Sequence, residues 1–245
     1  MSLRKVVLSA SPDSGSKCIV VASSFHTITQ TLALLQPGMK SWHVCDGLPI
    51  AGPKDFAFYQ GKLYVLLRFI PRLYAFELEE DDRGVVVSCV EHCMIDPLHD
   101  HVQDHGVLSC NIVVWRGHLL LIIRRYDTTD KFGPKRTLRQ VEVFALDFST
   151  NPCGLTEIRS DSIFVDSCGC NSFPAGLSDG VEGDLVYFVD QNTKYEGNSF
   201  DPSYDTFVYD VRNGTTRPFA VELSPHNFGA PRGKLDVPLW LLTSK

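Results

Sequence analysis

Long hydrophobic runs are absent from this sequence of 245 residues. The longest, at residues 119–123, is followed by Arg124 and Arg125 and is far shorter than the roughly 18 residues of a membrane-spanning helix. Near the N-terminus only residues 6–8 are apolar in succession, which is too few for the core of a signal peptide. We therefore expect no membrane contact and a location in the cytoplasm or the nucleus.

Positive charge is also scarce, since 23 Lys and Arg residues face 29 Asp and Glu residues, for a formal net charge of −6. Without a basic surface to neutralise phosphates, nucleic acid is not expected as a partner. The eight cysteines lie in a chain that is long for a disulfide scaffold and has no secretion signal. We expect their thiols to be reduced.

Short β-rich segments separated by turn residues dominate the sequence, and helical periodicity is nearly absent. The segments form four copies of one four-strand pattern, at about residues 5–44, 55–90, 107–158 and 163–221. Gly61, Gly117 and Gly183 precede the second strand of three copies, 56 and 66 residues apart, a period somewhat longer than that of a kelch blade. The pattern predicts an all-β fold, a β-propeller with about four four-stranded antiparallel blades. A β-sandwich, the alternative, would not require the same pattern four times.

The predicted propeller occupies residues 1–245 as a single domain. Propellers close by pairing strands from the two ends of the chain, because an open ring leaves unpaired strand edges. We expect residues 239–242 to supply the closing strand. Either the four blades close on themselves in this way, or the chain is an incomplete propeller.

Three long polar segments, at residues 95–106, 126–139 and 191–205, interrupt the repeat. Long loops on a repetitive scaffold are typical binding regions, although solvated inserts without a partner are an equal alternative. Aromatic and arginine side chains dominate protein interfaces. The sequence therefore predicts a protein partner, with candidate contacts in or directly beside these loops at Asp100, His101, Arg125, Tyr126, Lys131, Tyr195 and Tyr204.

Residues that can bind zinc gather in one region, namely Cys89, His92, Cys93, His99, His101, His105 and Cys110. Residues 99–105 resemble the His-x-His-x-Asp-His motif of the metallo-β-lactamase superfamily, but Asp104 lies three positions after His101 instead of two. No paired Cys-x-x-Cys spacing accompanies them. We expect no metal site, and keep a metal-dependent hydrolase using this loop as the alternative function.

Motifs for other chemistry are missing as well. The sequence contains neither a Gly-x-Ser-x-Gly elbow nor a phosphate-binding loop of the Walker type. The pair Cys168 and Cys170 lacks redox spacing and is expected in a turn between strands. No catalytic residue and no cofactor are therefore expected.

An ordered series of phrases resembles the plant KIB-type β-propeller, a kelch-related domain that follows an F-box in many proteins. The phrases are KSWHV at 40–44, DFAFYQGKLYV at 55–65, VEVFALDFS at 141–149, SIFV at 162–165, NSF at 171–173, GDLVYF at 183–188, FVYDV at 207–211 and PLWLL at 238–242. The resemblance implies substrate recognition for an SCF-type ubiquitin ligase. No F-box-like segment precedes Lys5, so binding of a Skp-type adaptor is not expected, and a truncated product without independent function is a further alternative.

Overall fold

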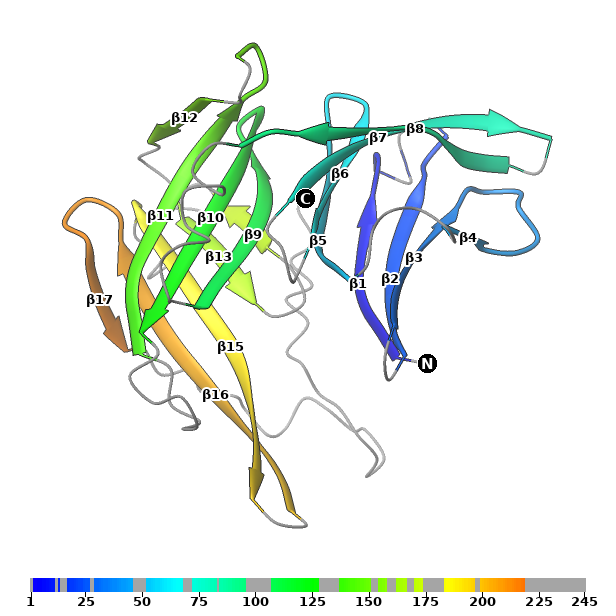
Figure 1. Ribbon diagram of the computed structural model, residues 1–245. Coiled ribbons are helices and arrows are strands. Elements are labelled where there is room, and N and C mark those ends of the chain that lie inside the picture. Colours follow the sequence, from blue (N-terminus) through cyan, green and yellow to red (C-terminus); the bar gives the residue numbers. More distant parts are fainter. Residues whose placement is uncertain are drawn as a thin grey trace.

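The computed structural model describes residues 2–11, 13, 17–26, 29–45, 52–67, 72–82, 84–95, 107–127, 137–150, 154–157, 162–166, 170–173, 183–196 and 199–218. These residues form 17 strands in four sheets that follow one another along the chain (Figure 1). The sheets are the blades of a four-bladed β-propeller, which confirms the predicted fold class. In the described part of the chain, no helix has the length and apolar character needed to cross a membrane.

The first three blades each contain four antiparallel strands in chain order. Blade 1 consists of β1 (Ser2–Leu8), β2 (Val20–His26), β3 (Thr29–Leu35) and β4 (His43–Val44). Blade 2 consists of β5 (Pro53–Tyr59), β6 (Lys62–Leu67), β7 (Leu73–Asp81) and β8 (Gly84–Cys93). Blade 3 consists of β9 (Val107–Trp115), β10 (His118–Asp127), β11 (Thr137–Asp147) and β12 (Gly154–Glu157). These three blades span residues 2–44, 53–93 and 107–157.

Blade 4 differs from the predicted pattern. It consists of β13 (Ser162–Asp166), β14 (Cys170–Phe173), β15 (Leu185–Glu196), β16 (Ser199–Asp210) and β17 (Thr215–Pro218). The strand order is β14-β13-β15-β16-β17, and β13 pairs with β15 in parallel. The expectation of a turn around Cys170 is wrong at that residue, because Cys170 begins β14 and pairs with Val165.

Two predicted hairpin turns have the expected tight geometry. Both central residues have positive φ, at Gln60 (47°) and Gly61 (79°) and at Arg116 (43°) and Gly117 (77°). This is the type I′ turn, whose twist matches that of the flanking strands. The predicted third member at Gly183 is different, because the preceding strand, β14, does not pair with β15, whose neighbour on that side is the parallel strand β13.

The hydrophobic core lies between successive blades rather than within one layer. Strand β10 is buried on both faces: Leu119, Leu121 and Ile123 face blade 2, while Leu120 and Ile122 face blade 4. This explains why the longest apolar run of the sequence shows no alternation. A third cluster, which includes Val21, Leu34, Leu63, Val65 and Phe76, joins blades 1 and 2.

The blades meet along an inner set of strands, since β5 contacts both β1 and β9, and β9 contacts β14. The additional strand of blade 4 therefore occupies the position that the first strand occupies in the other blades. The predicted closing strand at residues 239–242 lies outside the described residues.

Candidate functional site

A pocket of about 510 Å³ opens between blades 2 and 3. Three turns at the same end of the propeller form it: the β5–β6 turn, the β9–β10 turn and the segment that follows β11, all toward the top of Figure 1. We call this end the turn face. The lining residues are Tyr59, Gln60, Trp115, His118, Ala145, Leu146, Asp147, Phe148 and Ser149. A cavity of this volume is in the range that holds small ligands or single side chains of a partner.

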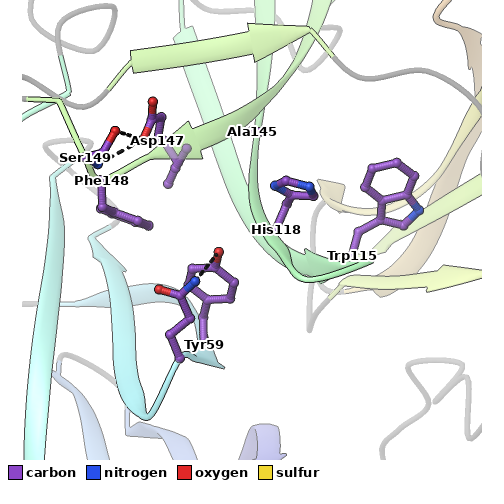
Figure 2. Close-up of a pocket in the computed structure, with 9 residues that line it drawn as sticks. Tyr59, Trp115, His118, Ala145, Asp147, Phe148 and Ser149 are labelled. Atoms are coloured by element: carbon purple, nitrogen blue, oxygen red, sulfur yellow. Dashed lines mark hydrogen bonds between the residues drawn. The ribbon is translucent and has the colours of Figure 1, made fainter.

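Aromatic rings form the walls of this pocket. In Figure 2, Phe148 and Asp147 lie on one side, His118 and Trp115 lie on the other, and Tyr59 lies below them. The Tyr59 ring centroid is 6.2 Å from that of Phe148, and Trp115 and His118 are 6.4 Å apart. The Tyr59 hydroxyl donates to the carbonyl of Gly117 (2.9 Å), which fixes this wall across the two blades.

The aromatic wall continues below the pocket through Tyr64. Its ring centroid lies 4.9 Å from that of Phe148 and 6.0 Å from that of Tyr59. Burial raises the pKa of Tyr64 to about 12, so its phenol is neutral at physiological pH. These three rings support one another, and the wall is preorganised before any ligand binds.

A carboxylate stands at the rim. The Asp147 Oδ1 atom accepts hydrogen bonds from the Ser149 backbone N–H (2.9 Å) and hydroxyl (2.6 Å). These bonds hold the pKa of Asp147 below its ordinary value of 3.8. The pocket therefore combines several π faces with one fixed negative charge.

A second polar cluster is buried where the inner strands meet. Asp55 on β5 is 1% exposed and forms an ion pair with Lys5 on β1. Its Oδ2 atom accepts from the Asn111 side chain (3.1 Å) and from the Ile112 backbone N–H (3.0 Å) on β9. Burial alone would raise the pKa of Asp55, but Lys5 and these hydrogen bonds outweigh it and hold the pKa below 3.8. One carboxylate thus joins three blades.

Arg124 extends this cluster to the fourth blade. Its guanidinium donates to the Asn111 side-chain oxygen (3.0 Å) and to the Ser109 hydroxyl (3.1 Å), and lies 4.9 Å from the centroid of the Phe188 ring. Beside it, burial raises the pKa of the Cys110 thiol to about 12, which keeps that thiol protonated and unreactive. Each charged or amide side chain of this cluster has a partner within the protein, namely Lys5, Asp55, Asn111 and Arg124. The cluster therefore links the blades to one another and is not a binding site.

Comparison with known proteins agrees with this architecture. The sequence pattern of the KIB1-4 β-propeller family matches residues 1–210. The chain belongs to this family. The family is associated with F-box proteins. No curated protein and no solved structure matches the chain.

Two of the sequence-predicted contacts of this KIB1-4 propeller, Arg125 and Tyr126, lie at the end of β10 that is remote from the pocket. Both are half-buried. The Arg125 guanidinium is already paired with Glu142 on β11, through Nη2 (2.9 Å) and Nε (3.0 Å). We call this end of the propeller, with the tip of the β15–β16 hairpin, the hairpin face (Figure 1).

Tyr195 and Tyr204 belong to the hairpin of blade 4. The expectation of a loop at residues 191–205 is wrong, because the β15–β16 ladder continues through these positions to the pair of Glu196 and Ser199. Tyr195 is opposite Phe200, and Tyr204 is opposite Gln191. By alternation along the strands these four positions share one face of the hairpin.

The remaining predicted contacts, Asp100, His101 and Lys131, lie outside the described residues, as do His99 and His105 of the alternative hydrolase site. Within the described residues, no group of three or more His, Cys, Asp or Glu side chains is placed to hold a metal ion. Cys18, Cys89 and Cys110 are free thiols.

The pocket was not predicted from the sequence, although a repeated four-residue pattern points to it. An aromatic residue, a polar residue, a glycine and a basic residue follow one another at residues 59–62 and again at 115–118. Each phrase spans a type I′ turn, and the propeller brings the two turns to the same end. Equivalent phrases in neighbouring blades therefore predict neighbouring aromatic side chains.

Proposed function

We propose that this chain is a non-enzymatic β-propeller that binds a protein partner and serves substrate recognition in an F-box-type ubiquitin ligase. Membership of the KIB1-4 family supports this proposal, since the family is associated with F-box proteins and its propellers are generally non-catalytic binding domains.

The single observation that carries the binding role is the β15–β16 hairpin. Strand β13 pairs with β15 only from Leu185 to Val189. Strand β17 pairs with β16 only from Phe207 to Asp210. The rest of the hairpin is a two-stranded ribbon without a neighbouring strand among the described residues, and it extends beyond the blade in Figure 1. An isolated two-stranded ribbon is marginally stable in water, so docking on a partner would stabilise it.

The two faces of this ribbon differ in chemistry. One face carries the positions of Gln191, Thr193, Tyr195, Phe200, Pro202 and Tyr204, and the other carries those of Asp190, Asn192, Lys194, Glu196, Ser199, Asp201, Ser203 and Asp205. Aromatic positions gathered on one face suit the hot spot of a protein interface. We propose Arg125, Tyr126, Tyr195 and Tyr204 as partner contacts on the hairpin face, with Asp100, His101 and Lys131 as further contacts.

Proximity labelling tests the binding role. The chain is fused to a promiscuous biotin ligase in plant cells, as wild type and as the double variant Tyr195→Ala/Tyr204→Ala. The matched control, Asn192→Ala/Ser203→Ala, alters one cross-strand pair on the other face of the same ribbon. We expect a set of proteins that the wild type and the control label and that the tyrosine variant does not.

Purified proteins then test one member of that set. The tyrosine variant should bind about 30-fold more weakly than wild type, the effect of losing a hot spot worth about 2 kcal/mol. Equal labelling by all three forms, or equal affinity of the purified variants, would reject the hairpin as the binding element.

A reconstituted reaction tests the ligase role separately. An F-box segment fused to the chain should direct ubiquitin transfer to the partner in the presence of adaptor, cullin and E2 enzyme. Tight binding without ubiquitin transfer would reject the ligase role and leave the binding role intact.

A further inference from the structure

We propose that the pocket on the turn face is a recognition site for an arginine side chain of a partner protein. This inference rests on the proposed protein-binding function and adds a second contact region, at the opposite end of the propeller from the β15–β16 ribbon.

The first argument is the chemistry of the walls. Tyr59, Trp115 and Phe148 line one cavity, and a cation over an aromatic face is stabilised by the quadrupole of the ring. The Trp115 ring already lies 5.3 Å from the guanidinium carbon of the neighbouring Arg116. Arg116 therefore already lies over one face of this indole, and Tyr59 and Phe148 are the other large aromatic side chains of the pocket.

The second argument is the position of the negative charge. Both hydrogen bonds from the turn go to Oδ1 of Asp147, so Oδ2 can accept from a ligand. Among the residues that the structure describes, no lysine or arginine forms an ion pair with Asp147. Lys62, which follows the β5–β6 turn, is paired instead with Glu77 (2.9 Å) and Glu91 (3.5 Å).

The third argument concerns shape. A guanidinium is planar, stacks on aromatic faces and donates to a carboxylate in its own plane, whereas an ammonium is a strongly hydrated point charge. The wall of Tyr59, Tyr64 and Phe148 is fixed by ring contacts and by the bond from Tyr59 to Gly117. Aromatic side chains next to a fixed carboxylate therefore favour arginine over lysine. The net charge of −6 further favours a basic partner segment.

The chain itself offers a matched control. Asp210 is the last residue of β16, as Asp147 is the last residue of β11, and its Oδ1 atom accepts from the backbone N–H of Arg212, two residues on, at 2.9 Å. Asp210 thus has the same turn geometry in the next blade, but the pocket does not include it. Asp210→Asn changes the net charge as Asp147→Asn does, without changing the pocket.

Fluorescence anisotropy with labelled peptides tests the proposal. The probe is an uncharged, acetylated Gly-Ser peptide with one central arginine, and the reference is the same peptide with citrulline, which keeps the shape and removes the charge. We expect saturable binding of the arginine peptide in 50 mM salt and at least fivefold weaker binding of the citrulline peptide. Asp147→Asn should weaken arginine binding at least about fivefold, and Phe148→Leu by about two- to tenfold, while Asp210→Asn should bind as wild type.

Several outcomes would overturn the proposal. They are equal affinity for arginine and citrulline, equal effects of Asp147→Asn and Asp210→Asn, and tighter binding of a lysine or trimethyl-lysine peptide. No saturable binding up to 1 mM peptide would also overturn it. Circular dichroism melts of each variant show that a loss of binding is not a loss of folding. Tyr195 and Tyr204 of the ribbon do not line this pocket, so the two tests are independent. Failure of the peptide-binding test would not change the result of the labelling test of the proposed function, and failure of the labelling test would not change the result of the peptide-binding test.

Discussion

At the scale of single residues, a small set of polar side chains is buried and held by hydrogen bonds between blades. Asp55, Asn111 and Arg124 are each at most 2% exposed, yet each is hydrogen-bonded across a blade boundary or to a residue that is. A buried charge is tolerated only when partners replace its water. Nothing in the alternation of residues 55–65 distinguishes Asp55 from a surface aspartate, because its partners come from β1 and β9. The sequence therefore predicted the strand that contains Asp55 but not the ion pair and hydrogen bonds that Asp55 makes with the neighbouring blades.

Replacing Asp55 by asparagine tests these interactions. At pH 7 Asp55→Asn should lower the free energy of unfolding by about 3–5 kcal/mol, because Lys5 loses the charge with which it is paired. The folded-state pKa of Asp55 lies below the unfolded value of 3.8. The carboxylate therefore stabilises the fold fully above about pH 4, and this contribution is lost as the pH falls through the lowered pKa. Urea unfolding at pH 7, 5 and 3 should show a difference from wild type that narrows at the lowest pH.

Asp82→Asn is the control for this prediction, since Asp82 is exposed in the β7–β8 turn. It should unfold within about 0.5 kcal/mol of wild type, as surface substitutions usually do. A variant of Asp55 that is as stable as wild type at pH 7, or a difference that is constant between pH 7 and 3, would contradict the role of the ion pair.

At the scale of elements, the sequence predicted those strands and turns that depend only on residues close together in the chain. Alternating segments and glycine turns predicted the strands of three blades, because a hairpin needs only neighbouring residues. The parallel orientation of β13 and β15 was missed, since the strand between them in the chain, β14, was not expected from residues 167–184. The ribbon at residues 191–205 was expected as a loop because of its polar composition. Backbone hydrogen bonds hold that ladder, and they leave no trace in hydrophobicity.

The same limit applies to the candidate site. Tyr195 and Tyr204 were chosen because they lie in a long polar segment, and the register now puts them on one face of the ribbon. The pocket could not be predicted without knowing that blades 2 and 3 are neighbours. Its walls come from Tyr59, Trp115 and Phe148, which are far apart in the sequence.

Two glycines in hairpin turns should respond differently to alanine. A Cβ atom added at Gly61 (φ 79°) would meet no other atom within 4 Å, so Gly61→Ala costs only left-handed backbone strain of about 1–2 kcal/mol. At Gly84 (φ 119°) a Cβ would lie 2.6 Å from both Cγ and Sδ of Met39 in blade 1. We expect Gly84→Ala to cost about 1–3 kcal/mol more than Gly61→Ala, because Met39 must move. Urea unfolding measures both.

The Met39 contact can be separated from strain by a double variant. In a Met39→Ala background, Gly84→Ala should cost about 1–3 kcal/mol less than in the parent chain, because the obstructing side chain is gone. If Gly84→Ala and Gly61→Ala are equally costly in the parent chain, the close approach of blade 1 to the β7–β8 turn has no energetic weight.

At the scale of the whole molecule, blades are joined by three separate apolar clusters and one polar chain. Strand β10 contributes to two of the clusters from its opposite faces. Among the residues that the structure describes, each apolar cluster joins neighbouring blades, as in other repeat architectures, where stability is approximately a sum of nearest-neighbour terms. The polar chain from Lys5 through Asp55 and Asn111 to Arg124 is the exception, since it spans several blades.

Neighbouring substitutions on β10 should therefore disturb different blades. Leu121 packs toward Leu66 and Ala75 of blade 2, whereas Ile122 packs toward Val186 and Phe188 of blade 4. Each truncation to alanine leaves a cavity and should cost about 2–5 kcal/mol. In hydrogen exchange, Leu121→Ala should raise exchange mainly in β6 and β7, and Ile122→Ala mainly in β13 and β15. Identical exchange patterns in the two variants would mean that the propeller opens as one cooperative unit, and nearest-neighbour coupling would then be wrong for this fold.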